Sequence, residues 1–189
     1  MLETKNHRLS LVIITLVILT TSVILYLQGR SLISTSGKVF LWVGDIWSAD
    51  NSQHLFDPYT FTHLLHGFFL GWLLILFAAK IPYNWQLTIV AIVESLWELI
   101  ENSNFVINRY REQTLALGYQ GDTIINSISD ILACSTGFII AKYLGLKKSF
   151  AVFVIVEVIM LLWIRDNLTL NVIMLIYPIE EIKQWQMGK

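Results

Sequence analysis

The chain contains little cysteine and little charge, and each shortage excludes a class of protein. The only cysteine is Cys134, so neither an intramolecular disulfide nor a cysteine-rich metal site can form. Charged residues make up 14% of the 189 residues, and the 13 Lys and Arg residues are scattered rather than gathered in a stripe. With a formal net charge of −1, the sequence gives no sign of nucleic-acid binding.

Hydrophobic residues, in contrast, are abundant. They make up 55% of the chain, and the mean hydropathy is +0.61. A soluble domain of this size has fewer apolar residues and about 25% charged ones. The composition therefore predicts an all-α integral membrane bundle that occupies residues 1–189 as a single transmembrane domain.

Five apolar segments predict transmembrane helices. They cover about 9–27, 59–79, 85–105, 122–142 and 149–164. The first lacks the small residues of a signal-peptide cleavage site, so we expect it to remain as an uncleaved helix. Residues 28–58 are predicted to form an outer loop. The stretch 168–177 is too short to span a bilayer and is predicted as a re-entrant or interfacial half-helix.

The positive charges indicate an orientation. With the N-terminus in the cytoplasm, the inner pieces are the short segments 1–8, 80–84 and 142–148. These carry Lys5, Arg8, Lys80, Lys142, Lys147 and Lys148. The outer pieces carry seven positive residues over a much greater length. Positive density in short loops favours the cytoplasmic side, so we expect a cytoplasmic N-terminus.

Ionisable side chains interrupt three consecutive apolar segments. They are His63, His66, Glu94, Glu98, Glu101, Asp122 and Asp130. A charge near the bilayer centre costs about 2.5–3.5 kcal/mol on insertion scales, so such residues usually face a partner or a cavity. Within each segment they are three, four or eight residues apart and therefore share a helix face. In the predicted orientation all of them lie in the outer half of the membrane, which predicts one shared pocket.

Depth along each predicted helix divides these residues into layers. His63, Glu101 and Asn126 are expected in a shallow layer. His66, Glu98 and Asp130 are expected about 9–12 Å deep, at about 1.5 Å per residue. Asp122 follows Gly121 and is predicted as the N-cap of the fourth helix rather than as a ligand.

Polar residues of the outer loops and helix ends are predicted to bind the substrate. They are His54, Asp57, Tyr59, Arg109, Arg111, Asn126 and Arg165. Gly67 and Gly71 form a GxxxG pattern, which permits close helix contact, and its neighbour is expected within this chain. Glu157 stands alone near the middle of the fifth predicted helix.

A metal site is the sharpest hypothesis for the pocket. His63, His66 and Glu98 would supply the nitrogen and oxygen ligands that zinc or another divalent metal prefers. Glu98, Glu101 and Asp130 are the candidate catalytic carboxylates, one of which would act as general base toward a metal-activated water. HExxH is absent, and four histidines are too few for a histidine-rich membrane desaturase.

Four strings in the sequence support a resemblance. They are SQHLFDPYTFTHLLHG, ESLWELIENSNFVINRYR, YQGDTIINSISD and IRDNLTLNVIMLIYP. With them, the chain from about residue 40 to its end resembles a family of small multi-pass inner-membrane proteins of bacteria, mainly alphaproteobacteria, whose function is unknown. The resemblance implies a bacterial inner-membrane location and supplies no activity.

Function is therefore predicted from chemistry. The first hypothesis is a metal-dependent hydrolase or transferase that acts on a lipid or lipid-linked substrate at the outer leaflet. Two alternatives stay open. One is a non-catalytic protein whose buried polar network is balanced by Arg109, Arg111 and Arg165. The other is a small transporter or ion-binding protein, although five helices are few and no inverted repeat is visible.

Overall fold

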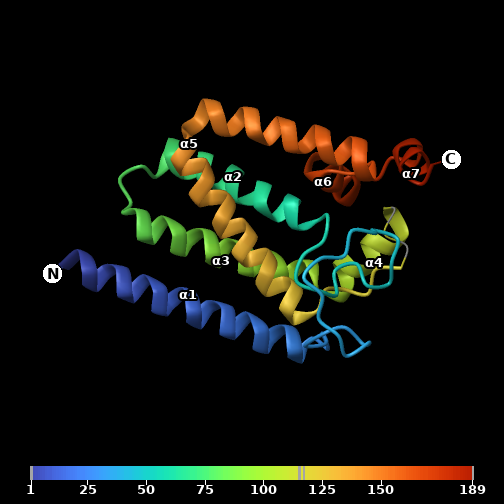
Figure 1. Cartoon of the computed structure of the whole chain (residues 1–189), viewed down its shortest axis with the longest axis horizontal. Helices are drawn as coiled ribbons and strands as arrows, with labels where there is room; N and C mark the ends of the chain where they lie inside the picture. The colour runs from blue at the N-terminus through green and yellow to red at the C-terminus, as the bar shows by residue number, and fades with distance from the viewer. Residues whose placement is uncertain (1, 115, 117, 189) are drawn as a thin grey trace.

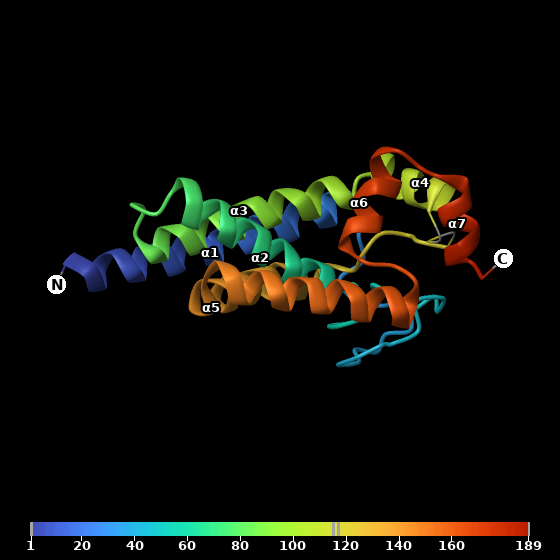
Figure 2. The ribbon, with the colours of Figure 1, turned by 90° about the horizontal axis from the view of Figure 1, so that it is seen from above.

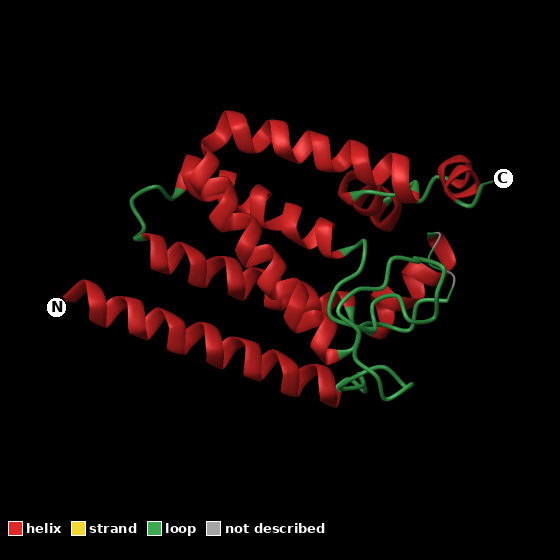
Figure 3. Ribbon diagram, viewed as in Figure 1, coloured by secondary structure: helices red, strands yellow, loops and turns green. Residues whose placement is uncertain are grey.

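The structure, a computed structural model, describes residues 2–114, 116 and 118–188. In this part the chain is all-helical, without strands, as Figure 3 shows. The helices are α1 (Leu2–Leu27), α2 (Thr60–Phe77), α3 (Tyr83–Glu101), α4 (Asn104–Gln113), α5 (Ile124–Ile164), α6 (Leu168–Ile176) and α7 (Glu180–Gln186).

Helix α5 contains both the fourth and the fifth predicted helices. Its two arms, 124–144 and 146–164, meet at Gly145, whose φ of 71° and ψ of 170° are not helical. A φ in this region favours glycine, which lacks the Cβ that would strain the backbone. The arms fold back on each other at this bend (Figure 1). The predicted inner segment 142–148 is thus a tight helical reversal.

Helix α4 was not predicted, and it begins where the third predicted helix, about 85–105, was expected to end. The third predicted helix ends at Glu101, and Asn102 is its C-cap. Ser103 then caps α4, since its side chain accepts a hydrogen bond from the Val106 N–H. A new N-cap directly after a helix end turns the chain, so α3 and α4 are separate helices. The predicted half-helix 168–177 corresponds to α6.

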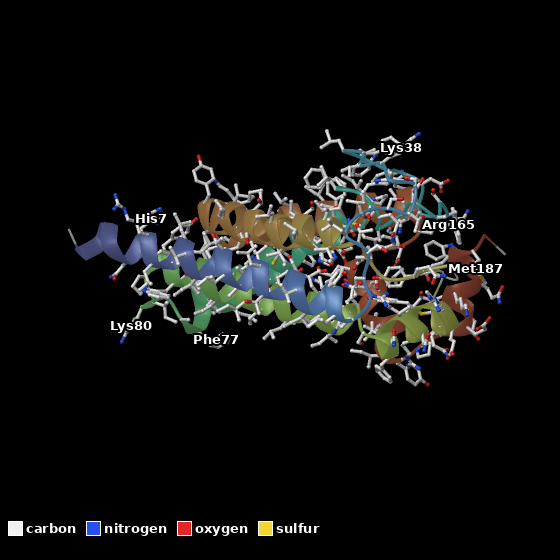
Figure 4. All side chains as sticks on the ribbon, turned by 90° about the horizontal axis from the view of Figure 1, so that it is seen from below. His7, Lys38, Phe77, Lys80, Arg165 and Met187 are labelled. Atoms are coloured by element: carbon white, nitrogen blue, oxygen red, sulfur yellow. The ribbon has the colours of Figure 1, made fainter. Side chains whose placement is uncertain are left out.

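The long helices lie side by side, and the bundle has two different ends (Figures 1 and 2). One end holds the N-terminus, the α2–α3 connection and the bend of α5. The other holds the long connection 28–59 together with α4, α6 and α7. In Figure 4, His7, Phe77 and Lys80 mark the first end, and Lys38, Arg165 and Met187 mark the second, called the loop end below.

Helices α2 and α5 cross at two glycines. A Cβ added at Gly67 would lie 1.9 Å from the Cys134 carbonyl oxygen, and one added at Gly137 would lie 1.9 Å from the Leu64 carbonyl oxygen. Only glycine allows two backbones to approach this closely. The prediction that the GxxxG pattern packs within the chain is confirmed.

The outer surface of the bundle is apolar, whereas its interior is largely polar near the loop end. Leu16, Leu76 and Leu162 are examples of apolar side chains that are more than half exposed. Among the described residues, two helices are long and apolar enough to cross a membrane: Asn6–Leu27 within α1, and α2. Membrane association thus has support, whereas five transmembrane helices remain a prediction.

Candidate functional site

Two histidines of α2 meet a carboxylate of α3. His63 Nδ1 lies 2.7 Å from Glu94 Oε1, and His66 Nδ1 lies 2.9 Å from the same oxygen. The histidines are three residues apart on one helix face, so both rings can reach one partner. Their ring centroids are 5.2 Å apart, and the His66 ring also stands edge-on to Trp97.

The start of α2 is fixed by Asp57. Its carboxylate accepts hydrogen bonds from the N–H groups of Ser52, Tyr59 and Thr60, at 3.0, 2.7 and 3.3 Å. Burial nevertheless raises the pKa of Asp57, against the effect of these hydrogen bonds. Asp57, predicted to bind substrate, is not on the wall of the cavity described below, and its carboxylate holds the segment that leads into the helix with both histidines.

Further carboxylates surround His63. Glu98 Oε1 lies 3.4 Å from His63 Nδ1, and Asp130 Oδ2 lies 3.9 Å from His63 Nε2. Within the part of the chain that the structure describes, neither Glu98 oxygen has a hydrogen-bond partner. The same holds for Asp130 Oδ1 and for Glu101 Oε2. Unpartnered buried carboxylate oxygens are costly, so this arrangement needs a cation or protons.

No lysine or arginine supplies that cation among the described residues. Every ion pair found there joins a histidine to a carboxylate. Arg109 donates to the carbonyls of Leu175 and Ile176 at the end of α6, at 3.0 and 3.2 Å. Arg111 and Arg165 likewise donate to the carbonyls of Tyr119 and Trp185. The predicted counter-charge role of these three arginines is therefore wrong.

Two overlapping groups of side chains could hold a metal ion. One consists of His63, His66 and Glu94, and the other of His63, Glu98 and Glu101. In each group the potential ligand atoms lie within 4.8 Å of one another. The predicted ligand set combined both histidines with Glu98, whereas the structure pairs them with Glu94. The predicted depth layers also shift, since His63 and not His66 lies nearest to Glu98 and Asp130.

A cavity of about 840 Å³ opens beside these groups. Six residues singled out from the sequence line it: Tyr59, His63, His66, Glu101, Asp122 and Asp130. Glu94 and Glu98 are not on its wall but are buried directly behind it, with 1% and 0% of their surface exposed. The cavity thus places the histidines between solvent space and the buried carboxylates.

Asp122 does not cap α5 as predicted. The N-cap is Thr123, whose side chain accepts from the Asn126 N–H. Asp122 accepts hydrogen bonds from Asn102 Nδ2 at 2.8 Å and from the Tyr119 hydroxyl at 2.9 Å. Burial raises its pKa although both hydrogen bonds lower it. Asp122 therefore joins α3 to the segment before α5 and forms part of the cavity wall.

The remaining predicted substrate contacts divide into two kinds. Tyr59 lies on the cavity wall, and its hydroxyl donates to Asp166 at 3.2 Å. His54 and Asn126 do not lie there. His54 Nδ1 accepts from the Phe40 N–H, and Asn126 donates to the His54 carbonyl. Arg109, Arg111 and Arg165 are also absent from the wall of this cavity. These five residues hold loops and helix ends together.

The structure adds cavity residues that the prediction left out. They are Arg30, Trp97 and Tyr110, whereas Tyr119 and Asp166, which also line the cavity, come from outer segments that were expected beside the pocket. Trp97 could have been found from the sequence, because it is three residues after Glu94 and shares its helix face. Burial raises the pKa of Asp166 to about 7, although it accepts hydrogen bonds from Tyr59, Asn167 and Gln186. Its neighbourhood is assembled from three distant segments and has no local signal.

Glu157 has a defined partner at the end of its helix hairpin. Its carboxylate accepts from the N–H groups of Leu168 and Thr169, at 2.9 and 3.1 Å, and from the Thr169 hydroxyl. These are the first residues of α6, where free N–H groups favour an acidic partner. The isolated acid of the sequence thus binds the first N–H groups of α6, next to the N-cap Asn167, and attaches α6 to α5.

Comparisons with known proteins identify the family. Residues 25–188 match a family model whose description is "Protein of unknown function (DUF2585)". The chain belongs to this family. It is 47% identical over 164 residues to a UPF0314 protein of Brucella anthropi, across 87% of this chain and 83% of the relative. It is 43% identical over 171 residues to a UPF0314 protein of Paracoccus denitrificans, across 90% and 89%.

These relatives confirm the resemblance seen in the sequence, because they come from alphaproteobacteria and cover most of the chain. A third, UPF0314 protein R03235 of Rhizobium meliloti, is 44% identical over 164 residues, across 86% of this chain and 83% of the relative. No solved structure matches the chain. The matched region contains every residue of the candidate site.

Proposed function

We propose that this protein is a membrane-embedded, metal-dependent hydrolase or transferase that acts on a lipid or lipid-linked substrate. The observation that carries this proposal is the set of buried carboxylates around His63 and His66, with no Lys or Arg within 4 Å among the described residues. Buried charges persist only when they are paired or bind a metal. A divalent cation would satisfy this set, and zinc matches its two imidazoles.

The membrane placement in this proposal uses five spans: α1, α2, α3 and the two arms of α5. It is supported by the apolar exterior of these helices and by the aromatic cluster of Trp42, Phe61 and Trp163 near the loop end. Aromatic side chains of this kind gather at the membrane–water boundary. Lys80 and the lysines around the α5 bend support a cytoplasmic position for the opposite end. The candidate site then faces the outer side of a bacterial inner membrane.

The proposed chemistry assigns the metal to His63, His66 and Glu94. When bound there, a divalent metal would supply a water molecule of lowered pKa and would polarise the group under attack. The water oxygen adds to the acyl carbon or phosphorus, and the bond to the alcohol oxygen breaks. One water proton passes to a neighbouring carboxylate and then to the departing alcohol. Glu98, Glu101 and Asp130 are the carboxylates in position to accept it.

The cavity supports an amphiphilic substrate. Its wall combines the acids and histidines with apolar side chains of α6, including Val172 and Leu175. Arg30 is also on the wall, where its terminal nitrogens donate to the carbonyls of Gln120 and Gln28, and its Nε has no hydrogen-bond partner among the described residues. A guanidinium binds phosphate or carboxylate well. An acyl chain would therefore lie along α6, with its polar headgroup toward Arg30.

Metal analysis of the purified protein tests the central part of the proposal. We expect at least one equivalent of zinc or another divalent metal in the unaltered protein and none in a His63→Ala/His66→Ala variant. His7→Ala is the matched control, since His7 is exposed near the N-terminus and far from the site. Equal metal content in all three proteins, or none in any, would contradict the proposal.

Lipid turnover tests the catalytic part. The protein in nanodiscs made from host membrane lipids is incubated, and the products are identified by mass spectrometry. Asp130→Asn is expected to keep the metal and lose turnover, whereas the exposed Glu180→Gln keeps both. Metal binding without any turnover in the unaltered protein would leave an ion-binding protein and reject the enzyme.

Labelling from outside the cell tests the orientation. A Lys38→Cys variant should react with a membrane-impermeant maleimide in intact cells, and a Lys80→Cys variant only after lysis. Cys134 is buried and gives little background. The reverse pattern would place the candidate site on the cytoplasmic side.

A further inference from the structure

We infer that the site has a second cation position, formed by Glu98 and Glu101 beside His63, so that it binds a pair of divalent cations. This inference rests on the proposed metal-dependent function and extends it. The first position, at His63, His66 and Glu94, engages both oxygens of Glu94, which lie 2.9 and 3.2 Å from His66 Nδ1. Glu98 and Glu101 are left for a separate ion.

Helix geometry places these two acids together. Glu98 and Glu101 follow Glu94 by four and seven residues, so all three lie on one face of α3. Ligand atoms of His63, Glu98 and Glu101 lie within 4.8 Å of one another. Since Glu101 reaches the cavity wall and Glu98 is fully buried behind it, an ion at this position would be open to substrate on one side.

The unpartnered oxygens point to a ligand. Glu98 is 0% exposed, and both of its carboxylate oxygens lack a hydrogen-bond partner among the described residues. Glu101 Oε2 is also buried without one. Other acids of this chain, such as Glu157 and Asp166, accept several hydrogen bonds. Glu98 thus differs from acids that serve to hold helices together, and Glu101, which has a side-chain hydrogen bond with Tyr110, keeps one oxygen without a partner among the described residues.

The charge of the site also indicates two divalent cations. Four carboxylates lie around His63 and His66, namely Glu94, Glu98, Glu101 and Asp130. One divalent cation would offset two of their negative charges, and no Lys or Arg within 4 Å offsets the others in the described part of the chain. With both histidines neutral, as metal ligands are, a second divalent cation balances the four carboxylates when all are ionised.

The two positions differ in ligand chemistry. The first offers two imidazole nitrogens and favours zinc, whereas the second is dominated by carboxylate oxygens and favours a harder ion such as Mn²⁺ or Mg²⁺. Paired ions about 3.5–4 Å apart stabilise the attacking and the leaving oxygen of a displacement at the same time. With Glu98 and Glu101 occupied as ligands, Asp130 is left as the proton acceptor.

The test is a metal titration of the full-length protein in detergent. After chelation, Zn²⁺ and then Mn²⁺ are added, and bound metal is measured by mass spectrometry and by the electron paramagnetic resonance signal of Mn²⁺. We expect one equivalent of each. Glu98→Gln and Glu101→Gln should keep zinc and lose manganese, and His66→Gln should lose zinc and keep manganese. Glu180→Gln is the control and should bind both.

The outcomes separate this inference from the proposed function. A single equivalent of metal in the unaltered protein overturns the second position and leaves the proposed function standing. No bound metal overturns both. Loss of both metals in Glu98→Gln and Glu101→Gln, with helical content unchanged by circular dichroism, also overturns the second position, because it would show a single shared centre.

Discussion

The same helices, α2, α3 and α5, enclose two interiors of opposite character. Away from the loop end, Leu74, Val90 and Phe138 pack in a buried apolar cluster together with Cys134. Toward the loop end, the corresponding space is filled by histidines and carboxylates such as His63 and Glu98. The glycine crossing of α2 and α5 lies between these two halves.

This difference indicates a division of labour along the bundle. The apolar half gains stability from close packing, in which even one methylene group matters. The polar half contains carboxylates without partners, which cost stability unless an ion binds. The apolar half and the crossing therefore hold the helices in register, and the polar half offers the groups that could bind an ion. Four predictions test this comparison.

The largest effect is expected at the crossing. Gly67→Ala would bring a Cβ to 1.9 Å from the Cys134 carbonyl oxygen, so the helices must separate. Overpacking costs about 1–3 kcal/mol and occasionally more. We expect a loss at or above the top of this range in the free energy of unfolding, measured in detergent. Gly71→Ala is the matched control, because its Cβ would meet the Ala141 Cβ at 3.2 Å and Phe138 no closer than 3.6 Å. Equal effects at the two glycines would contradict the crossing.

The next effect is a gain in stability from the polar half. Glu98→Met replaces an unpartnered buried carboxylate by an apolar side chain of similar size. A buried polar group without a hydrogen-bond partner costs about 1–3 kcal/mol, and His63, which lies 3.4 Å from Glu98, keeps its contact with Glu94 in this variant. We expect a higher unfolding midpoint than the unaltered protein in the presence of a chelator. A lower midpoint would show that Glu98 stabilises the fold through contacts with its neighbours, and it would argue against Glu98 as an ion ligand.

Asp166 should make stability depend on pH. Its folded pKa of about 7 lies above the usual value of 3.8, so the folded protein binds more protons than the unfolded chain between these values. Stability contributed by Asp166 is therefore complete below pH 3.8 and is lost as pH rises to about 7. The slope is at most about 1.4 kcal/mol per pH unit.

Asp166→Asn removes this contribution. From pH 4 to pH 7 the unaltered protein should lose stability relative to the variant, because only the unaltered protein has the Asp166 contribution to lose. Above pH 7 the difference in unfolding free energy between the two proteins should stay constant. Gln186 and Tyr59 can both reorient toward an amide, since Gln186 Oε1 has no partner among the described residues. A difference independent of pH would reject the raised pKa.

The smallest effect is expected where an acid of the loop end is fully paired. Glu157→Gln keeps the shape of the side chain but weakens its bonds to the Leu168 and Thr169 N–H groups. Loss of a charge at a helix N-terminus costs typically 0.3–1 kcal/mol, so we expect a destabilisation of about 1 kcal/mol or less. Metal content should not change, because Glu157 belongs to neither candidate metal group.

The sequence was a good guide wherever the signal is local. Helical periodicity located α2, α3, α6 and both arms of α5 within a few residues, and spacing of three and four placed His63 and His66 on one face. The GxxxG pattern correctly predicted an internal helix contact. The residues of the polar half were also recognised, because ionisable side chains in apolar segments are rare.

Pairing across helices could not be read in the same way. Rise per residue gives depth but not the rotation of a helix about its axis, and rotation brought Glu94 rather than Glu98 to both histidines. The arginines were misjudged for a related reason. The sequence shows their charge, but only the folded chain shows that Arg109 and Arg111 end on backbone carbonyls.

The sequence by itself determined an all-helical, strongly apolar chain with one set of costly polar residues, because these properties follow from composition and from contacts a few residues apart. The tertiary structure alone decided which carboxylates have partners and which have none. Glu157 and Asp166 are satisfied by helix ends that close around them, and Glu98 is buried without any such group. That distinction depends on long-range packing, and it makes the histidines of α2 the centre of the candidate site.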